Sequence, residues 1–298
     1  MTRIAVLSGK GGTGKTTAVA SMAWYSQGLV LADCDVDAAN LALTMNGRLR
    51  TKNDYRGALK ARIDPQACIE CGKCEDVCIF GAISDFKVNE IHCEGCGACR
   101  IVCPEDAVTL EYLKSGEIYV LDTERGPMAY AELFPGESNS GKLVTEVRRL
   151  ADDLAESDGY DTVLIDGPPG TGCPAIASVT GADLILAITE PSMSGEHDLM
   201  RLIDLAQHFS IPLCVAINKW DLHPGSARNI EGSCHDKGVM VVGKVPYDPT
   251  VLKAIKAMRP LPSLFPRSPA ALAFHHIWRE VSGRAVARKG SGVLLKLD

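Results

Sequence analysis

The sequence lacks a long apolar run, an excess of positive charge and a leader-like start. No stretch approaches the roughly 18–20 consecutive apolar residues that span a bilayer, so we expect no transmembrane segment. The 298 residues carry 31 Lys and Arg against 37 Asp and Glu, a net charge of −6, which argues against nucleic acid as a partner. The start, MTRIAVLSGKGG, predicts a strand entering a glycine loop, not a signal peptide. We therefore expect a cytoplasmic protein.

Cysteine, in contrast, is abundant and unevenly placed. Eight of the 12 cysteines lie between Cys68 and Cys103. Because disulfides are disfavoured in a reducing compartment, this density indicates metal or redox chemistry in a small domain of its own.

The rest of the chain alternates short apolar, β-branched runs with longer helical patterns. This alternation predicts an α/β fold, a mostly parallel sheet with helices on both faces. The segment Met128–Ser140, rich in Gly, Pro and small polar residues, is expected to be irregular, either a mobile loop near a nucleotide or a plain surface connection. The expected strands are Ile4–Leu7, Leu29–Ala32, Thr162–Ile165, Leu184–Ile188, Leu213–Ile217 and Met240–Val242, and the expected helices lie near Lys15–Ser26, Gly141–Glu156, Glu196–His208, Thr250–Met258 and Pro269–Val286.

The alternation breaks between Gly57 and Leu113. This stretch holds two similar halves, CIECGKCEDVCIFGAI and CEGCGACRIVCPEDAV, the mark of a duplicated small domain. We therefore predict a discontinuous α/β domain, residues 1–57 and 114–298, with an inserted small α+β domain at residues 58–113.

A phosphate-binding motif follows the first expected strand. Residues Gly9–Thr16, GKGGTGKT, match G-x-x-x-x-G-K-[ST] between a strand and a helix. Glycines let successive backbone N–H groups turn toward phosphates, and the helix N-terminus adds its positive end. Lys15 is expected to contact the β- and γ-phosphates, Thr16 to bind Mg²⁺ and Thr17 to contact the α-phosphate. The nucleotide-binding residues predicted here are Gly9, Lys10, Gly11, Gly12, Thr13, Gly14, Lys15, Thr16 and Thr17.

Lys10, early in the loop, makes K-G-G-T-G-K-T-T resemble the deviant Walker A motif of the MinD, ParA and nitrogenase-iron-protein superfamily of P-loop ATPases. The resemblance implies that Lys10 crosses a dimer interface and neutralises charge on the partner's nucleotide. The alternative is a solvated loop lysine. The family also places an aspartate after the second strand to orient the attacking water; Asp35 matches best, while Asp33 or Asp37 could instead cap a helix or belong to an ordinary loop.

Asp166 ends the strand TVLID and resembles the Walker B aspartate, which holds Mg²⁺ directly or through water. The following Gly167–Gly172 resembles switch II, where glycine-rich backbone can rearrange in response to the γ-phosphate.

Two later segments resemble regions that border the purine in relatives. Asn218 lies in INKWD, and Pro246, Tyr247 and Asp248 lie in VPYDP. N-K-x-D also resembles the guanine signature of GTPases, in which Asp221 would contact the base. The MinD-like group often carries this string yet uses ATP, so ATP is favoured over GTP.

The two cysteine runs match the bacterial two-cluster ferredoxin pattern, C-x2-C-x2-C-x3-C, in which the fourth cysteine of each run serves the other cluster. Structural zinc, which takes paired C-x2-C knuckles separated by a longer loop, fits the spacing poorly. Ile79 stands where the second run has Pro104, a departure that affects loop shape and not ligation. The pattern assigns Cys68, Cys71, Cys74 and Cys103 to one 4Fe–4S cluster and Cys78, Cys93, Cys96 and Cys99 to the other.

The other cysteines are expected to be small apolar core residues: Cys34, Cys214 and Cys234. Cys173 follows Asp166 by seven residues, the offset of a cluster ligand in the nitrogenase iron protein. No second cysteine of that pair occurs in Gly126–Gly141, and the C-P-x-C motif of Mrp-type carriers is also absent, so a structural role is favoured for Cys173 too.

The resemblance implies a nucleotide-dependent dimer, either a homodimer or a dimer with a related ATPase, that hydrolyses ATP under stimulation by a partner. An ATPase that also carries two 4Fe–4S clusters is expected to couple ATP hydrolysis to electron transfer, and the first hypothesis is therefore ATP-gated electron transfer to a redox partner. A second hypothesis is iron–sulfur or metallocluster assembly, with a metallocluster acceptor as the partner. A third is spatial positioning; membrane-bound relatives use a C-terminal amphipathic helix, for which VARKGSGVLLKLD is short and interrupted by glycine.

Overall fold

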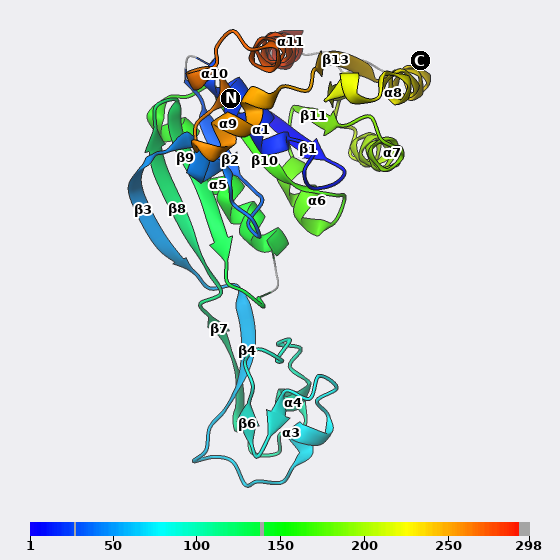
Figure 1. The fold of residues 1–298 in the computed structure, drawn as a ribbon. Helices are drawn as coiled ribbons and strands as arrows, with labels where there is room; N and C mark the ends of the chain where they lie inside the picture. The colour runs from blue at the N-terminus through cyan, green and yellow to red at the C-terminus, as the bar shows by residue number, and fades with distance from the viewer. Residues whose placement is uncertain (27, 138–139, 292–298) are drawn as a thin grey trace. The chain divides into compact units, whose positions relative to one another are not determined.

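The chain separates into two compact units (Figure 1). The computed structural model describes residues 1–26, 28–137 and 140–291. The first unit comprises Met1–Lys52, Ile118–Ala131 and Ser140–Asp298, and the second comprises Asn53–Glu117 and Glu132–Asn139. The predicted insert, residues 58–113, lies within the second unit.

Within the described residues, nine strands form one sheet in the order β13-β12-β11-β1-β10-β2-β9-β8-β3. Neighbouring strands from β13 to β9 pair in parallel, and helices cover the sheet. The predicted fold class, a mostly parallel α/β fold, is therefore confirmed. The strands are β1 (Thr2–Ser8), β2 (Val30–Asp33), β3 (Arg48–Tyr55), β8 (Gly116–Thr123), β9 (Gly126–Leu133), β10 (Thr162–Pro169), β11 (Leu184–Thr189), β12 (Leu213–Asn218) and β13 (Met240–Val245).

The helices follow the predicted ranges closely, and all five expected ones are present. The sequence patterns missed α8 and the short helices α2, α6 and α10. Helix α6 begins directly after the glycines that follow β10. The helices of this unit are α1 (Lys15–Trp24), α2 (Leu41–Met45), α5 (Ser140–Asp158), α6 (Cys173–Val179), α7 (Met193–His208), α8 (Pro224–Asp236), α9 (Pro249–Lys256), α10 (Leu261–Leu264) and α11 (Pro269–Ser291), with the 3₁₀ turn η1 (Trp220–Leu222).

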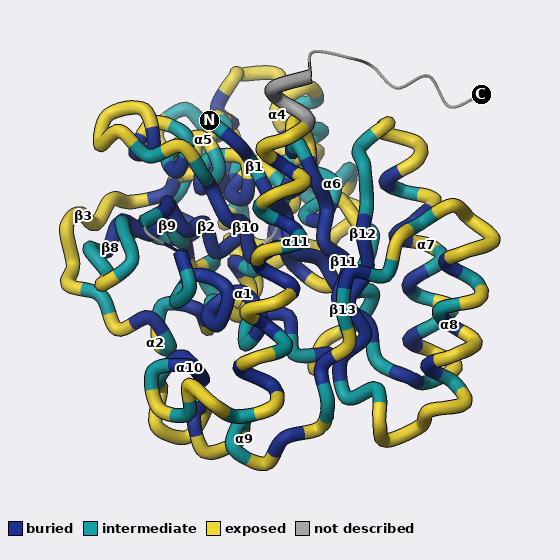
Figure 2. Tube along the Cα trace, turned by 90° about the horizontal axis from the view of Figure 1, so that it is seen from above, coloured by how far each residue is buried: buried dark blue, intermediate teal, exposed yellow. Residues whose placement is uncertain are grey.

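The central strands are buried on both faces, which is why their apolar character is nearly continuous. In β1, Ile4 and Val6 pack in the core cluster that includes residues of α1 and α11, while Ala5 and Leu7 are equally buried. Because side chains alternate along a strand, both faces of β1 must be covered. Figure 2 shows this pattern, with dark blue central strands and yellow outer surfaces on α7 and α8.

The expectation that Met128–Ser140 is irregular was wrong for its first half. Residues Gly126–Leu133 form β9, in which Met128 pairs with Leu31 and Ala129 with Ala32 of β2. Both residues are fully buried, so packing beside β2 outweighs the turn-like composition. Residues 138–139 lie outside the described part of the chain.

The second unit contains two small antiparallel sheets. Strand β4 (Ala58–Ile63) pairs with β7 (Val108–Leu113), and β5 (Ile83–Ser84) pairs with β6 (Lys87–Val88). Two single-turn helices, α3 (Lys73–Asp76) and α4 (Ala98–Ile101), each begin after a glycine with positive φ.

No helix in the described residues is long and apolar enough to cross a membrane. The C-terminal segment weighed as a membrane anchor falls partly outside the described residues, which end at 291.

Candidate nucleotide site and cysteine-lined cavities

The glycine loop joins β1 to α1, as its motif predicts. Gly12 and Gly14 have φ values of 80° and 93°, which favour glycine, and Gly14 precedes the first turn of α1 with no side-chain cap. The N–H groups of this first turn lack intrahelical partners and, together with the helix dipole, suit a phosphate. Thr16 and Thr17 lie in the same turn and are half-buried.

Lys15 and Asp166 form a buried ion pair beneath the loop. Lys15 Nζ lies 2.6 Å from Asp166 Oδ1, and the side chains are 7% and 1% exposed. Burial acts to lower the pKa of Lys15, but the Asp166 charge and hydrogen bond raise it overall. The other carboxylate oxygen, Oδ2, is buried and has no hydrogen-bond partner among the described residues. A desolvated, unpaired carboxylate oxygen beside a phosphate site is a suitable ligand for Mg²⁺ or for its bound water.

Two aspartates follow β2 next to this pair. Asp33 lies beside Asp166 across the β2–β10 pairing and is fully buried; its carboxylate accepts hydrogen bonds from the backbone N–H groups of Asp35 and Leu41. Burial and the Asp166 charge raise the pKa of Asp33 well above its usual range. Asp33 therefore stabilises the backbone of the loop that follows β2. Asp35 is half-buried, and burial raises its pKa, although the charge of Lys15 acts to lower it.

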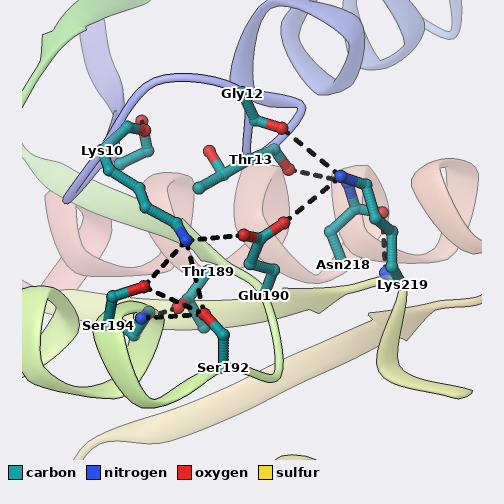
Figure 3. A network of polar contacts seen from close by, with 11 residues as sticks. Lys10, Gly12, Thr13, Thr189, Glu190, Ser192, Ser194, Asn218 and Lys219 are labelled. Atoms are coloured by element: carbon teal, nitrogen blue, oxygen red, sulfur yellow. Dashed lines mark hydrogen bonds and ion pairs between the residues drawn. The ribbon is translucent and has the colours of Figure 1, made fainter. Parts of the chain in front are cut away.

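Lys10 contacts residues of its own chain at the end of β11 (Figure 3). Its Nζ lies 2.7 Å from Glu190 Oε1 and donates to Ser194 Oγ at 2.9 Å and to Ser192 Oγ at 3.4 Å. Lys219 Nζ lies 3.2 Å from the other carboxylate oxygen of Glu190. Burial would raise the pKa of Glu190, but the hydrogen bonds and charges of Lys10 and Lys219 lower it. Glu190 belongs to none of the sequence motifs; its position at the C-terminal end of a predicted parallel strand was the available signal.

The residues predicted to border the purine have protein partners. Asn218 Nδ2 donates to the carbonyl of Thr13 at 2.7 Å, beneath the glycine loop. Asp221 Oδ1 accepts from the backbone N–H of Tyr247 at 2.7 Å, which joins INKWD to VPYDP. Tyr247 is 53% exposed beside half-buried Pro246, whereas buried Asp248 is the N-cap of α9. Tyr247 and Pro246 thus remain accessible, and Asp248 organises the backbone.

Two cavities in the described part of the second unit are lined by cysteines from both runs. The Cys68 cavity brings together three cysteines of the first run and the last one of the second: Cys68, Cys71, Cys74 and Cys103. The Cys93 cavity brings together three cysteines of the second run and the last one of the first: Cys93, Cys96, Cys99 and Cys78. Each cavity thus gathers the four thiols that the spacing assigned to one cluster.

The surroundings of these thiols suit thiolate ligands of a 4Fe–4S cluster. Backbone N–H groups donate to sulfur at 3.4 Å in three places, from Glu70 to Cys68, from Ala82 to Cys78 and from Ala61 to Cys93. Such N–H···S bonds stabilise negative charge on sulfur. No group of three or more His, Cys, Asp or Glu in the described residues is arranged to hold a single metal ion.

Of the four other cysteines, three are core residues as predicted: Cys34, Cys214 and Cys234 are buried. Burial raises the pKa of all three thiols, that of Cys214 to about 12 and that of Cys234 to about 11. Cys173 differs, because it is exposed at the first residue of α6. Cys173 is therefore not a buried core residue, and the structural role favoured for it stays a prediction.

The glycine loop, its buried lysine and the strand-end carboxylates define a P-loop nucleotide-binding protein. Comparison with known proteins agrees: the CobQ/CobB/MinD/ParA nucleotide-binding domain family matches residues 4–261. The uncharacterized protein MJ0578 of Methanocaldococcus jannaschii is 41% identical over 223 residues, 73% of this chain and 78% of that protein. The septum site-determining protein MinD of Bacillus subtilis is 24% identical over 295 residues, 95% of this chain and 90% of that protein.

Among solved structures, MinD of Pyrococcus horikoshii complexed with Mg-ADP matches with a TM-score of 0.59 and 19% identity, covering 96% of this chain and 98% of that one. That likeness shows the fold. The chain belongs to the CobQ/CobB/MinD/ParA nucleotide-binding family and is a MinD/ParA-like ATPase.

Proposed function

We propose that this protein is a dimerising ATPase whose insert, residues 58–113, holds two 4Fe–4S clusters and passes electrons to a redox partner under the control of ATP. The observation that carries the proposal is the exchange of the fourth cysteine between the Cys68 and Cys93 cavities. Two unrelated structural zinc sites would not require this exchange. When bound, such clusters carry single electrons at potentials set by charge, hydrogen bonds and exposure.

In the nucleotide half, the glycine loop would bind the phosphates through backbone N–H groups, with Lys15 turning from Asp166 toward the β- and γ-phosphates. Asp166 and Thr16 would then hold Mg²⁺. The unpaired Oδ2 of Asp166 supports this exchange of partners, because a buried carboxylate oxygen is costly to leave without one. Asp35, whose raised pKa reflects partial burial, would orient the attacking water.

Lys10 would complete the site in a dimer, where the deviant Walker A resemblance places it against the partner's nucleotide. Its contacts with Glu190 and Ser194 are then those of the resting chain and must break when the dimer forms. The second copy would be this chain or a related ATPase, and hydrolysis would rise when the redox partner binds.

ATP is favoured over GTP as the substrate. In the guanine signature the aspartate uses its carboxylate to contact the base, but here Asp221 Oδ1 already accepts a hydrogen bond from the Tyr247 backbone. The exposed Tyr247 ring would instead lie near the purine.

Coupling requires only a modest energy. A bound nucleotide that favours one of two dimer states by a few kcal/mol changes their populations by two orders of magnitude or more. Gly167–Gly172, directly after Asp166, is the segment that would transmit the state of the γ-phosphate.

The test is electron paramagnetic resonance of anaerobic, dithionite-reduced protein with and without Mg-ATP, beside assays of iron, sulfide and ATP hydrolysis. We expect about eight irons per chain and two interacting signals that change with ATP, and about four irons in Cys96→Ser. Cys234→Ser, a buried cysteine outside the runs, is the matched control and should keep eight. Bound zinc in place of iron would refute the proposal.

Clusters whose reduction leaves ATP turnover unchanged would refute the coupling. Transfer of labelled iron from the chain to an apo-acceptor would favour the assembly hypothesis instead, because a carrier of electrons retains its clusters.

A further inference from the structure

The second unit contains a buried lysine beside the Cys93 cavity. Lys60, on β4, is 7% exposed, although Arg62, two residues along the same strand face, is exposed. Lys60 Nζ donates to the backbone carbonyl of Cys93 at 2.9 Å, and the next residue, Ala61, donates its N–H to Cys93 Sγ at 3.4 Å. A lysine is rarely buried without a role, because desolvating its charge is costly.

The charge partner of this lysine is Glu137. Its Oε2 lies 3.6 Å from Lys60 Nζ, an ion pair beyond hydrogen-bond distance. The same oxygen is buried and has no hydrogen-bond partner among the described residues. Glu137 therefore offsets the lysine charge only in part, since the two groups are not in direct hydrogen-bonded contact.

The duplicated halves differ at this position. Lys60 stands eight residues before Cys68, and Asp85 stands eight residues before Cys93. The residues that follow them, Ala61 and Phe86, line the Cys93 and Cys68 cavities respectively. The matching positions thus carry opposite charges, with the cation buried and Asp85 exposed.

We propose that Lys60 makes the two clusters unequal by raising the reduction potential on the Cys93 side, and that Glu137 limits this effect. The proposal rests on the two-cluster function proposed above. Reduction adds one negative charge, which a nearby buried cation stabilises in a medium of low dielectric constant. A single electron held by the unit then resides on the cluster of the Cys93 cavity. An electron that enters at the other cluster moves there when the cluster of the Cys68 cavity is oxidised and that of the Cys93 cavity is reduced. This fixes the direction of electron flow within the unit.

The experiment is a redox titration followed by electron paramagnetic resonance on the full-length anaerobic protein. In Lys60→Gln we expect one of the two midpoints to fall by at least the equivalent of a tenfold change in the reduction equilibrium, 59 mV for one electron. In Glu137→Gln the same midpoint should rise. Lys60→Arg keeps the charge and should stay near the native value. Lys87→Gln, which removes an exposed lysine of the same unit, should move neither midpoint.

Midpoints that move together, or a fall in Glu137→Gln, would overturn the proposal. If Lys60→Gln does not retain its irons, the proposal is tested by the other two variants, in which the midpoint should rise in Glu137→Gln and stay near the native value in Lys60→Arg. Failure of the broader function looks different: a native chain without iron and sulfide refutes cluster binding itself, whereas eight irons with two unmoved midpoints refute only the role of Lys60.

Discussion

Replacing Glu190 by glutamine is expected to strengthen ATP-dependent dimerisation. In the single chain Glu190 holds Lys10 at 2.7 Å, and the side chains are 21% and 32% exposed. If Lys10 contacts the partner's nucleotide in the dimer, this ion pair must break first. Partly exposed pairs contribute about 0.5–1 kcal/mol each. Each dimer breaks two, so their removal favours association by about 1–2 kcal/mol, a five- to thirtyfold decrease in the dimer dissociation constant.

The measurement is analytical ultracentrifugation of the chain with a non-hydrolysable ATP analogue, with nucleotide affinity measured separately on the monomer. The matched control is Glu196→Gln in α7, the helix that follows Glu190, because Glu196 accepts a hydrogen bond from Ser233 Oγ rather than from a lysine. It should change the dissociation constant by less than about twofold. An unchanged or weaker dimer in Glu190→Gln would refute the idea that the resting contact of Lys10 competes with its role across the interface.

Three further outcomes follow from the structure. Asp166→Asn removes the charge opposite Lys15 and one Mg²⁺ ligand, so ATP hydrolysis should fall by about a hundredfold or more in a phosphate-release assay; a rate within tenfold of native would exclude Asp166 from metal binding. Asp248→Ala removes the N-cap of α9 and should cost about 1–2 kcal/mol in denaturant unfolding at pH 7. Burial acts to raise the pKa of Asp248, but its hydrogen bonds lower it overall. This stabilisation is therefore present above the unfolded pKa of Asp248 and is lost as pH falls through the folded pKa; a stability difference that does not shrink as pH falls through that range would contradict this sign. Gly95→Ala places a Cβ 2.0 Å from the Leu59 carbonyl oxygen at a φ of +64°, so it should lower the iron content or the melting temperature of the protein, and native values of both would show that the loop can shift.

Much of the fold could be predicted from the sequence because the parallel strands carry their own signal. Strands such as β11 and β12 are buried along nearly their whole length, and all their residues except the last are apolar. Strand β9 (Gly126–Leu133) could not be predicted from the sequence, because its Gly, Pro and small residues are typical of a loop. It forms a strand because β2 provides a pairing partner. The exposure of Cys173 could not be predicted for a related reason, because whether a cysteine is buried depends on what packs over it.

The candidate site likewise has parts that the sequence predicts and parts that only the tertiary structure determines. Gly9–Thr16 and the two cysteine runs are contiguous, so their spacing alone determined which chemistry to expect. The ion pairs beside these motifs join residues far apart in the chain, as Lys10 and Glu190, Lys15 and Asp166, or Lys60 and Glu137 do. A short motif fixes which groups are available, because its backbone geometry is local. Which charge a buried group faces, and how strongly, was decided only by the tertiary structure, because desolvation and proximity arise when distant segments pack together.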